Sequence, residues 1–211
     1  GDVDGDGVPE IICFAPNQSY NFYGVTDVKV YNSITHNVIH TVSLPDRVST
    51  VDASPYGIVK LPNGHVIFVA AMMNQTMQAY DLTSMSPTPL WSVNMEYYTS
   101  NVGFADFNND TYPEIYVGNK IYDAESGNLL IDNSNITNVG GAYANPLYSS
   151  DPKTLSPFAA DVIGDNKLEL LLGNEIYGVD ITNRNGTAGN SISLAASVNP
   201  PQGVGSDGHA Q

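Results

Sequence analysis

Two segments of the chain carry the same pattern of acidic and amide side chains at alternate positions. Residues 2–11 are Asp-Val-Asp-Gly-Asp-Gly-Val-Pro-Glu-Ile, and residues 106–115 are Asp-Phe-Asn-Asn-Asp-Thr-Tyr-Pro-Glu-Ile. Both place a side-chain oxygen at positions 1, 3, 5 and 9 and a backbone carbonyl at position 7. A hard cation such as Ca²⁺ takes about six to eight oxygen ligands, and a tight turn of this composition supplies most of them. The pattern therefore predicts two cation-binding loops.

We name residues 2–10 loop 1 and residues 106–114 loop 3. Their predicted metal ligands are the side chains of Asp2, Asp4, Asp6 and Glu10 with the carbonyl of Val8, and the side chains of Asp106, Asn108, Asp110 and Glu114 with the carbonyl of Tyr112. Gly7 allows the left-handed backbone that such a turn requires. We expect one or two structural Ca²⁺ ions, because clustered carboxylates repel one another without a cation. The alternative is an acidic turn that holds no metal.

An EF-hand is the nearest competing interpretation, and the spacing argues against it. An EF-hand needs a glutamate at loop position 12 and a helix on each side. Position 12 is Cys13 in the first segment and Val117 in the second. In both segments the acidic residue at position 9 is followed by a short apolar run that is typical of a β-strand. Each loop is therefore predicted to connect two strands.

Two further segments extend the pattern into a fourfold repeat. Residues 161–169, named loop 4, keep acids at positions 1, 5 and 9 but have Ile163 at position 3, where a ligand belongs, and Lys167 at position 7. Residues 57–69 keep a turn and a strand but have lost every acid, and Lys60 is expected at the place of the first aspartate. Loop 4 is therefore expected to bind metal weakly or not at all, and residues 57–69 to bind none.

Each copy of the turn is followed by a predicted strand that contains a tyrosine. These strands are expected at residues 28–32, 77–81, 119–123 and 174–178. The repeats are then residues 1–52, 53–98, 99–154 and 155–211. No stretch shows sustained helical periodicity with caps. Each repeat therefore predicts four strands, with the cation loop between the first and the second.

This organisation predicts an all-β fold, namely a β-propeller made of four-stranded antiparallel blades. A four-stranded unit that repeats every ~50 residues matches a propeller blade, and a sandwich or a β-solenoid explains the period less well. Residues 1–211 then form about four blades of one propeller segment. We expect the segment to belong to a larger propeller or array, because the chain begins inside loop 1 and residues 203–211 resemble the approach to another loop. A four-bladed ring closed by its termini is the alternative.

The loop motif resembles that of the FG-GAP/VCBS repeat family, the calcium-loop propeller blades of integrin α-subunits and many bacterial surface proteins. The motif is Asp-x-Asp/Asn-x-Asp-Gly-x-x-Asp/Glu followed by a strand. Loop 1 matches it fully, and loop 3 departs from it only at Thr111, which replaces the turn glycine. The resemblance covers essentially the whole chain. It implies structural calcium in the loops and a place at the cell surface.

Composition excludes some classes of partner and supports an extracellular location. The chain has 211 residues, 42% of them apolar, and 7 basic against 22 acidic side chains, for a net charge of −15. Such a surface disfavours nucleic acid and anionic membranes, and no apolar span is long enough for membrane insertion. Calcium loops of modest affinity fill where calcium is roughly millimolar, outside the cell. We therefore expect an extracellular or cell-surface protein.

Weaker motifs add a few expectations. Five Asn-x-Ser/Thr sequons, which matter only if the source glycosylates, lie at Asn17, Asn74, Asn109, Asn135 and Asn185. Cys13 is the single cysteine and is expected to be a buried thiol. His36 and His40 could share a strand face, although isolated histidines are commoner, and Trp91 is expected in the core. Candidate exposed aromatic residues are Tyr97, Tyr98, Tyr143 and Tyr148.

Three functions fit these features. The favoured one is a non-catalytic module for adhesion, carbohydrate or protein binding, or surface assembly, in which long loops such as residues 138–156 bind a partner. The second is the propeller portion of a secreted polysaccharide lyase, because some rhamnogalacturonan lyases resemble the family, but the few basic residues are scattered. The third is a purely structural fibre or spacer. Open blade edges would also allow self-association. No catalytic residue is assigned.

Overall fold

The computed structural model describes residues 2–15, 24–49, 55–95, 101–133, 157–172 and 175–197. All regular elements in these ranges are β-strands, so the predicted all-β class is confirmed. We find among them no helix with the length and apolar character needed to cross a membrane. The chain divides into two compact units, residues 1–99 and residues 100–211.

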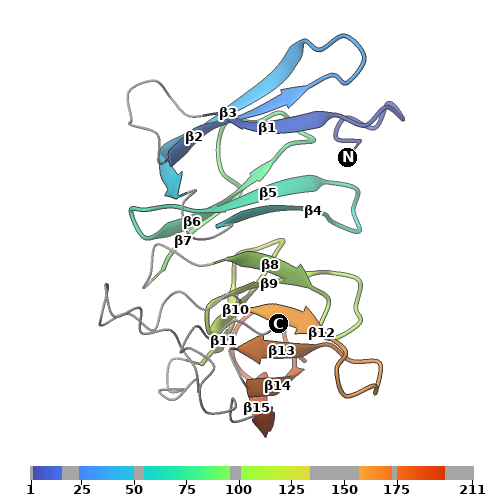
Figure 1. The fold of residues 1–211 in the computed structure, drawn as a ribbon, viewed down its shortest axis with the longest axis vertical. Helices are drawn as coiled ribbons and strands as arrows, with labels where there is room; N and C mark the ends of the chain where they lie inside the picture. Colours follow the sequence, from blue (N-terminus) through green and yellow to red (C-terminus); the bar gives the residue numbers. More distant parts are fainter. Residues whose placement is uncertain are drawn as a thin grey trace, which may run out of the picture. The chain divides into compact units, whose positions relative to one another are not determined.

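The first unit contains two antiparallel sheets (Figure 1). The first sheet has the order β1 (Ile11–Ala15), β2 (Gly24–Tyr31), β3 (Val38–Ser49), and the second has the order β4 (Tyr56–Lys60), β5 (Val66–Ala71), β6 (Thr76–Asp81), β7 (Trp91–Asn94). Neighbouring strands follow one another in sequence, so each sheet is a meander.

The second unit repeats this arrangement with two four-stranded sheets. The third sheet contains β8 (Val102–Ala105), β9 (Glu114–Val117), β10 (Lys120–Asp123) and β11 (Leu129–Asp132), and the fourth contains β12 (Phe158–Ala160), β13 (Glu169–Leu172), β14 (Glu175–Asp180) and β15 (Ser191–Ser197). The predicted tyrosine strands are β2, β6, β10 and β14. The antiparallel four-sheet organisation is thus confirmed, while the closure of the sheets into a propeller stays a prediction.

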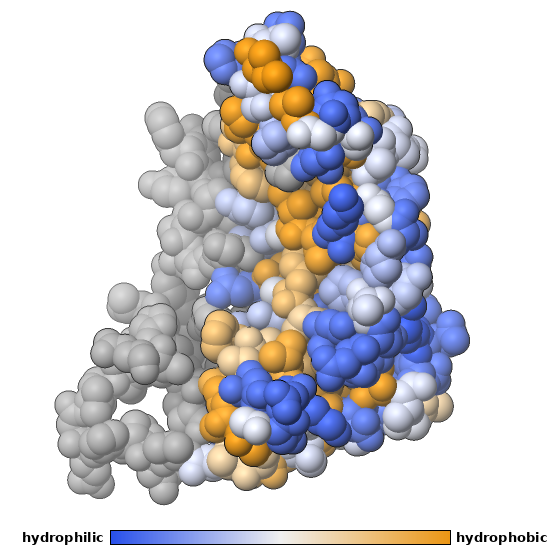
Figure 2. All heavy atoms as spheres, turned by 90° about the vertical axis from the view of Figure 1, so that its right-hand side faces the viewer, coloured by the Kyte–Doolittle hydropathy of each residue, from blue (hydrophilic) through white to orange (hydrophobic). Residues whose placement is uncertain are grey.

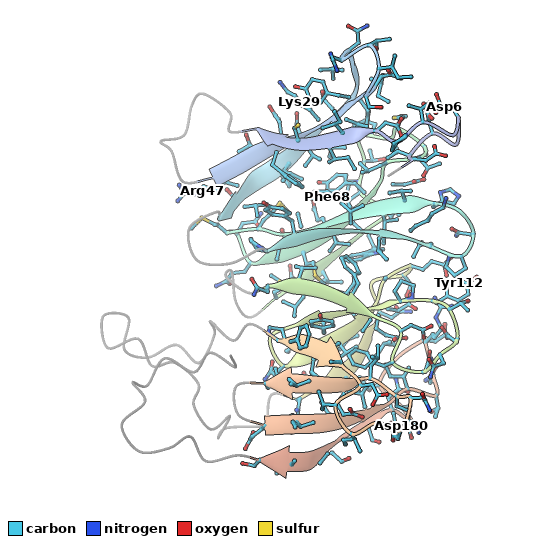
Figure 3. The ribbon with its side chains drawn as sticks, turned by 45° about the vertical axis from the view of Figure 1, so that its right-hand side comes forward. Asp6, Lys29, Arg47, Phe68, Tyr112 and Asp180 are labelled. Atoms are coloured by element: carbon cyan, nitrogen blue, oxygen red, sulfur yellow. The ribbon has the colours of Figure 1, made fainter. Side chains whose placement is uncertain are left out.

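The core of the first unit lies between its two sheets. Alternation along β2 buries Val28 and Val30 on the face toward the second sheet, as expected for a strand with one buried face. Phe68 of β5, labelled in Figure 3, is fully buried in this core. Its ring lies 5.7 Å from that of Phe14 and 6.4 Å from that of Tyr80. The aromatic cluster therefore joins the two sheets.

The core of the second unit is built in the same way, around Phe107 of loop 3, Tyr116 of the third sheet, and Leu170 and Tyr177 of the fourth. Phe107 and Tyr116 pack edge to face at a centroid distance of 6.0 Å. A side chain at Gly103 would place its Cβ 2.1 Å from Cζ of Tyr116. A glycine in strand β8 is therefore required for the Tyr116 ring to lie across it.

Two minor expectations were wrong, and a disfavoured alternative is not supported. Cys13 is exposed, because residues alternate along β1 and its neighbours Ile12 and Phe14 face the core. Trp91 is only half-buried in β7. His36 lies in the turn before β3 with a positive φ of 58°, so it does not share a strand face with His40.

Candidate metal centre

Strand pairing places loops 3 and 4 at equivalent points of their sheets. Ala105 pairs with Glu114 across loop 3, and Ala160 pairs with Glu169 across loop 4. Loop 1 precedes β1, and loop 3 precedes β9. β1 pairs with the tyrosine strand β2, just as β9 pairs with the tyrosine strand β10. Each loop therefore leads into the strand that pairs with the tyrosine strand, as the sequence predicted.

Loop 1 is held by its own carboxylates, which accept hydrogen bonds from nearby backbone N–H groups. The N–H of Gly7 donates to Asp2 at 3.2 Å, and the N–H of Val8 donates to Asp6 at 2.7 Å. The buried Glu10 accepts from the N–H of Val3 at 2.5 Å. These bonds join position 1 to 6, position 5 to 7 and position 9 to 2, and so close the turn.

Loop 3 uses the same three connections. The N–H of Thr111 donates to Asp106 at 2.9 Å, and the N–H of Tyr112 donates to Asp110 at 2.7 Å. The N–H of Phe107 donates to Glu114 at 2.9 Å. Asn108 occupies position 3, where loop 1 has an aspartate, and its amide donates to Asp110 at 3.1 Å.

Loop 4 repeats the scheme although its ligand pattern is incomplete. The N–H groups of Asn166, Lys167 and Val162 donate to Asp161, Asp165 and Glu169 at 3.0, 2.9 and 2.9 Å. Positions 4 and 6 have positive φ in all three loops: 81° and 86° at Gly5 and Gly7, 59° and 75° at Asn109 and Thr111, and 83° and 65° at Gly164 and Asn166. One backbone conformation therefore underlies all three loops.

In loop 1 the fold brings three predicted ligands together. The ligand atoms of Asp2, Asp4 and Glu10 lie within 4.8 Å of one another, which makes this the one such group of His, Cys, Asp or Glu in the described part of the chain. Asp6, labelled in Figure 3, is exposed and lies outside the group, and Val8 is half-buried. Positions 1, 3 and 9 thus converge, with an all-oxygen donor set that suits a hard cation.

In loop 3 the same three positions carry Asp106, Asn108 and Glu114. Glu114 is completely buried, and its Oε1 atom receives no hydrogen bond from the described residues. The pKa of Glu114 is raised to about 7, because the upward effects of burial, the largest cause, and of the charges on Asp110, Asp106 and Asp123 outweigh the downward effect of the Phe107 hydrogen bond. A buried carboxylate oxygen without a donor is costly, and a bound cation would relieve that cost. The residues of loop 3 therefore fit a cation.

The other two copies differ from loops 1 and 3. Ile163, at position 3 of loop 4, offers no oxygen, and its side chain is 55% exposed. Loop 4 therefore lacks an oxygen ligand at one of the three converging positions. On the face drawn in Figure 2, hydrophobic residues (orange) are exposed among hydrophilic ones (blue).

The turn of the second sheet corrects one expectation. Lys60 pairs with Val66 as Ala105 pairs with Glu114, so the buried Leu61, and not Lys60, stands at the place of the first aspartate. The N–H of Leu61 donates to the carbonyl of His65 at 2.7 Å, and the N–H of Gly64 donates to the carbonyl of Leu61 at 2.9 Å, which closes this shorter turn. His65 contacts Asp81 at 2.8 Å. The expectation was wrong by one residue because the turn is shorter than the cation loops, which the sequence comparison did not allow for.

Sequence reasoning missed Arg184, which lies in the connection between β14 and β15. Nε and Nη2 of Arg184 each lie 2.7 Å from Oδ2 of the buried Asp123. Nη2 lies 3.2 Å from Glu125, Nε lies 3.9 Å from Asp110, and the guanidinium carbon stands 3.9 Å from the centroid of the Tyr112 ring. The only sequence signal was the scarcity of basic residues, which makes each one informative.

Several predicted positions carry less information. The sequon residues Asn74, Asn109 and Asn185 are exposed. Asn17, Asn135, Tyr97, Tyr98, Tyr143, Tyr148 and the segments 138–156 and 203–211 lie outside the described residues.

Comparison with known proteins bears on the fold. No family model matches the sequence, and no curated protein matches it. The V. cholerae biofilm matrix protein Bap1 is similar in structure, with a TM-score of 0.55 and 18% identity over 89% of this chain and 28% of that one. A rhamnogalacturonan lyase of Bacillus licheniformis overlaps less closely, with a TM-score of 0.41 and 14% identity over 78% of this chain and 37% of that one. The chain thus spans less than a third of the length of the matrix protein, and the likeness to it concerns the fold.

Proposed function

We propose that this chain is a calcium-stabilised β-propeller segment of the FG-GAP/VCBS kind, which acts outside the cell as a non-catalytic module for binding or assembly. The observation that carries the proposal is the common geometry of loops 1 and 3. Both have the same hydrogen-bond scheme, and both retain oxygen ligands at positions 1, 3 and 9.

The propeller part of the proposal is supported by the form of the sheets. Each is an antiparallel meander, and within each unit two successive sheets pack face to face through buried side chains. Successive blades of a propeller pack in this manner. The cation loop at the same point of three sheets is the feature shared with FG-GAP/VCBS blades.

The cation would have a structural role. Asp2, Asp4 and Glu10 would hold it in loop 1, and Asp106, Asn108 and Glu114 in loop 3, with the Val8 and Tyr112 carbonyls and the remaining acid of each loop completing the sets. A bound Ca²⁺ supplies positive charge that offsets the repulsion among these carboxylates. The loops themselves are preformed by local hydrogen bonds, so binding would stabilise an existing turn.

The extracellular assignment rests on chemistry and on the likeness in fold. Loops of this kind fill at extracellular calcium levels, and a net charge of −15 suits a secreted acidic surface. The similar fold belongs to a biofilm matrix protein, which supports a role in a matrix or on a surface. The partner would be an extracellular protein or a glycan. The described basic side chains are spread over all four sheets, and no described observation favours lyase chemistry.

Thermal unfolding in Ca²⁺ and in EDTA tests the calcium role. We expect a higher melting temperature in Ca²⁺, a smaller shift in Asp4→Ala and in Asn108→Ala, and almost none in the double variant. Asp180→Ala is the matched control, since it removes an exposed acid outside the loops and should leave the shift unchanged. Equal melting of the wild type in both buffers would overturn the proposal. If the calcium-dependent shift is observed, a glycan panel is screened next. Binding in Ca²⁺ that is lost in EDTA would identify the partner as a glycan.

A further inference from the structure

One basic side chain from the fourth sheet reaches the acidic loop of the third. Arg184 contacts Asp123, Glu125 and Asp110 and covers the ring of Tyr112. Asp110 and Tyr112 are both predicted ligand positions of loop 3. The backbone carbonyl of Arg184 also accepts a hydrogen bond from the side-chain amide of Asn128, at 3.3 Å.

The first unit has a different residue at the equivalent place. β6 ends at Asp81 and β14 ends at Asp180, and the next residue in each case, Leu82 or Ile181, is buried in the core of its unit. Three residues further on, the first unit has Met85, which packs against the core cluster that includes Val3 of loop 1. Arg184 therefore stands where the first unit has an apolar side chain.

The charges around the two loops differ accordingly. Arg184 lies among Asp110, Asp123 and Glu125, of which Asp123 is almost completely buried. No described ion pair joins a basic side chain to Asp2, Asp4 or Asp6 of loop 1. Within the described part of the chain, loop 3 thus has a basic side chain against its carboxylates, and no such ion pair is found at the three aspartates of loop 1.

We propose that Arg184 is a built-in counter-cation of loop 3, which holds this loop in shape without metal and opposes the binding of Ca²⁺ to it. The inference rests on the proposed calcium function. Arg184 acts through Asp110 and Tyr112 as a positioning residue. A guanidinium and a divalent cation that share the carboxylate of Asp110 also repel each other. Ca²⁺ therefore binds loop 1 more tightly than loop 3. By thermodynamic linkage, Ca²⁺ in loop 3 weakens the ion pairs of Arg184 with the third sheet by the same factor by which Arg184 weakens calcium binding.

Calcium titration calorimetry on a background that silences loop 1, Asp2→Asn with Asp4→Asn, tests this directly. Arg184→Met installs the residue of the first unit, and we expect it to tighten calcium binding at loop 3 by about tenfold. Arg184→Lys keeps the charge and should bind calcium as the background does. Met85→Ala is the matched control in the other unit and should leave this affinity unchanged. Adding Asn108→Ala should abolish the signal and so assign it to loop 3.

Arg184→Met leaves the buried carboxylate of Asp123 without its ion-pair partner, which could destabilise the fold. A second variant therefore combines Arg184→Met with Asp123→Asn, which removes that buried charge. Tighter binding in either Met variant supports the inference, since a merely structural role would weaken binding. If the background protein binds calcium and both Met variants bind it equally or more weakly, the counter-cation role of Arg184 is overturned. The proposed calcium function is then unaffected. No binding in the wild type or any variant overturns both.

Discussion

Loop 1 and loop 3 have the same backbone and different surroundings. In both loops, the side chain at position 1 accepts a hydrogen bond from the backbone N–H of position 6. The side chains at positions 5 and 9 accept in the same way from the N–H groups of positions 7 and 2. In both, the residue at position 2 is buried in the core of its unit. Around loop 1 the next sheet contributes the apolar Met85 to that core, whereas beside loop 3 it contributes Arg184. The motif therefore sets the shape of a cation loop, and the neighbouring sheet sets the charge around it.

The largest effect that would test this comparison comes from Glu114, whose pKa in the folded protein is about 7 against an ordinary 4.5. A raised carboxyl pKa favours the protonated form in the folded state. Its stabilising contribution is therefore complete below about pH 4.5 and is lost as pH rises through about 7. In EDTA, Glu114→Gln should equal the wild type near pH 4 and exceed it at pH 8 by up to about 3 kcal/mol.

Urea unfolding of both proteins across this pH range measures the difference. Asp180→Asn controls for the loss of one exposed negative charge and should not reproduce the profile. In Ca²⁺ the order should reverse, because the glutamine lacks the charge that binds the cation. If the difference in unfolding free energy between the wild type and Glu114→Gln is the same at all pH values, Glu114 does not titrate in this range and the prediction is wrong.

A smaller effect extends the comparison to loop 4, which shares the backbone but lacks one ligand. Ile163→Asp restores position 3, and the existing turn conformation should then accept a cation. At a calcium concentration ten times the new dissociation constant, the gain in unfolding free energy is about 1.4 kcal/mol. Calorimetry should show one more calcium ion per chain, and Ile163→Leu, the apolar control, should show none. An unchanged stoichiometry would mean that the loop conformation does not suffice.

The smallest predicted effect concerns backbone strain. Thr111 has a φ of 75° at position 6, where loop 1 has Gly7 with a φ of 86°. A β-branched residue in this left-handed region is strained, so Thr111→Gly should raise the unfolding free energy by about 1 kcal/mol. The reciprocal change, Gly7→Thr, should lower it by a similar amount. Denaturant midpoints in EDTA measure both, and equal midpoints for all three proteins would contradict the strain.

The structure bears out what the sequence predicted where the signals were local. The alternating acids predicted turns that lead into strands, and the tyrosine segments predicted β2, β6, β10 and β14. The single error in register, at Lys60, arose where the turn had lost its acids and become shorter. The wrong expectations for Cys13 and Trp91 have a related cause. An apolar run shows that a strand is present but not which face of it another sheet covers.

The sequence by itself determined the conformation of the three loops, because their hydrogen bonds join residues no more than seven positions apart. Left-handed backbone at positions 4 and 6 completes that local code. Only the tertiary structure decided the electrostatics of each loop. Arg184 and Asp123 are 61 residues apart in sequence, and packing of the fourth sheet on the third brings them within 2.7 Å. Coulomb interactions depend on distance in space, so no local pattern could place that guanidinium beside loop 3.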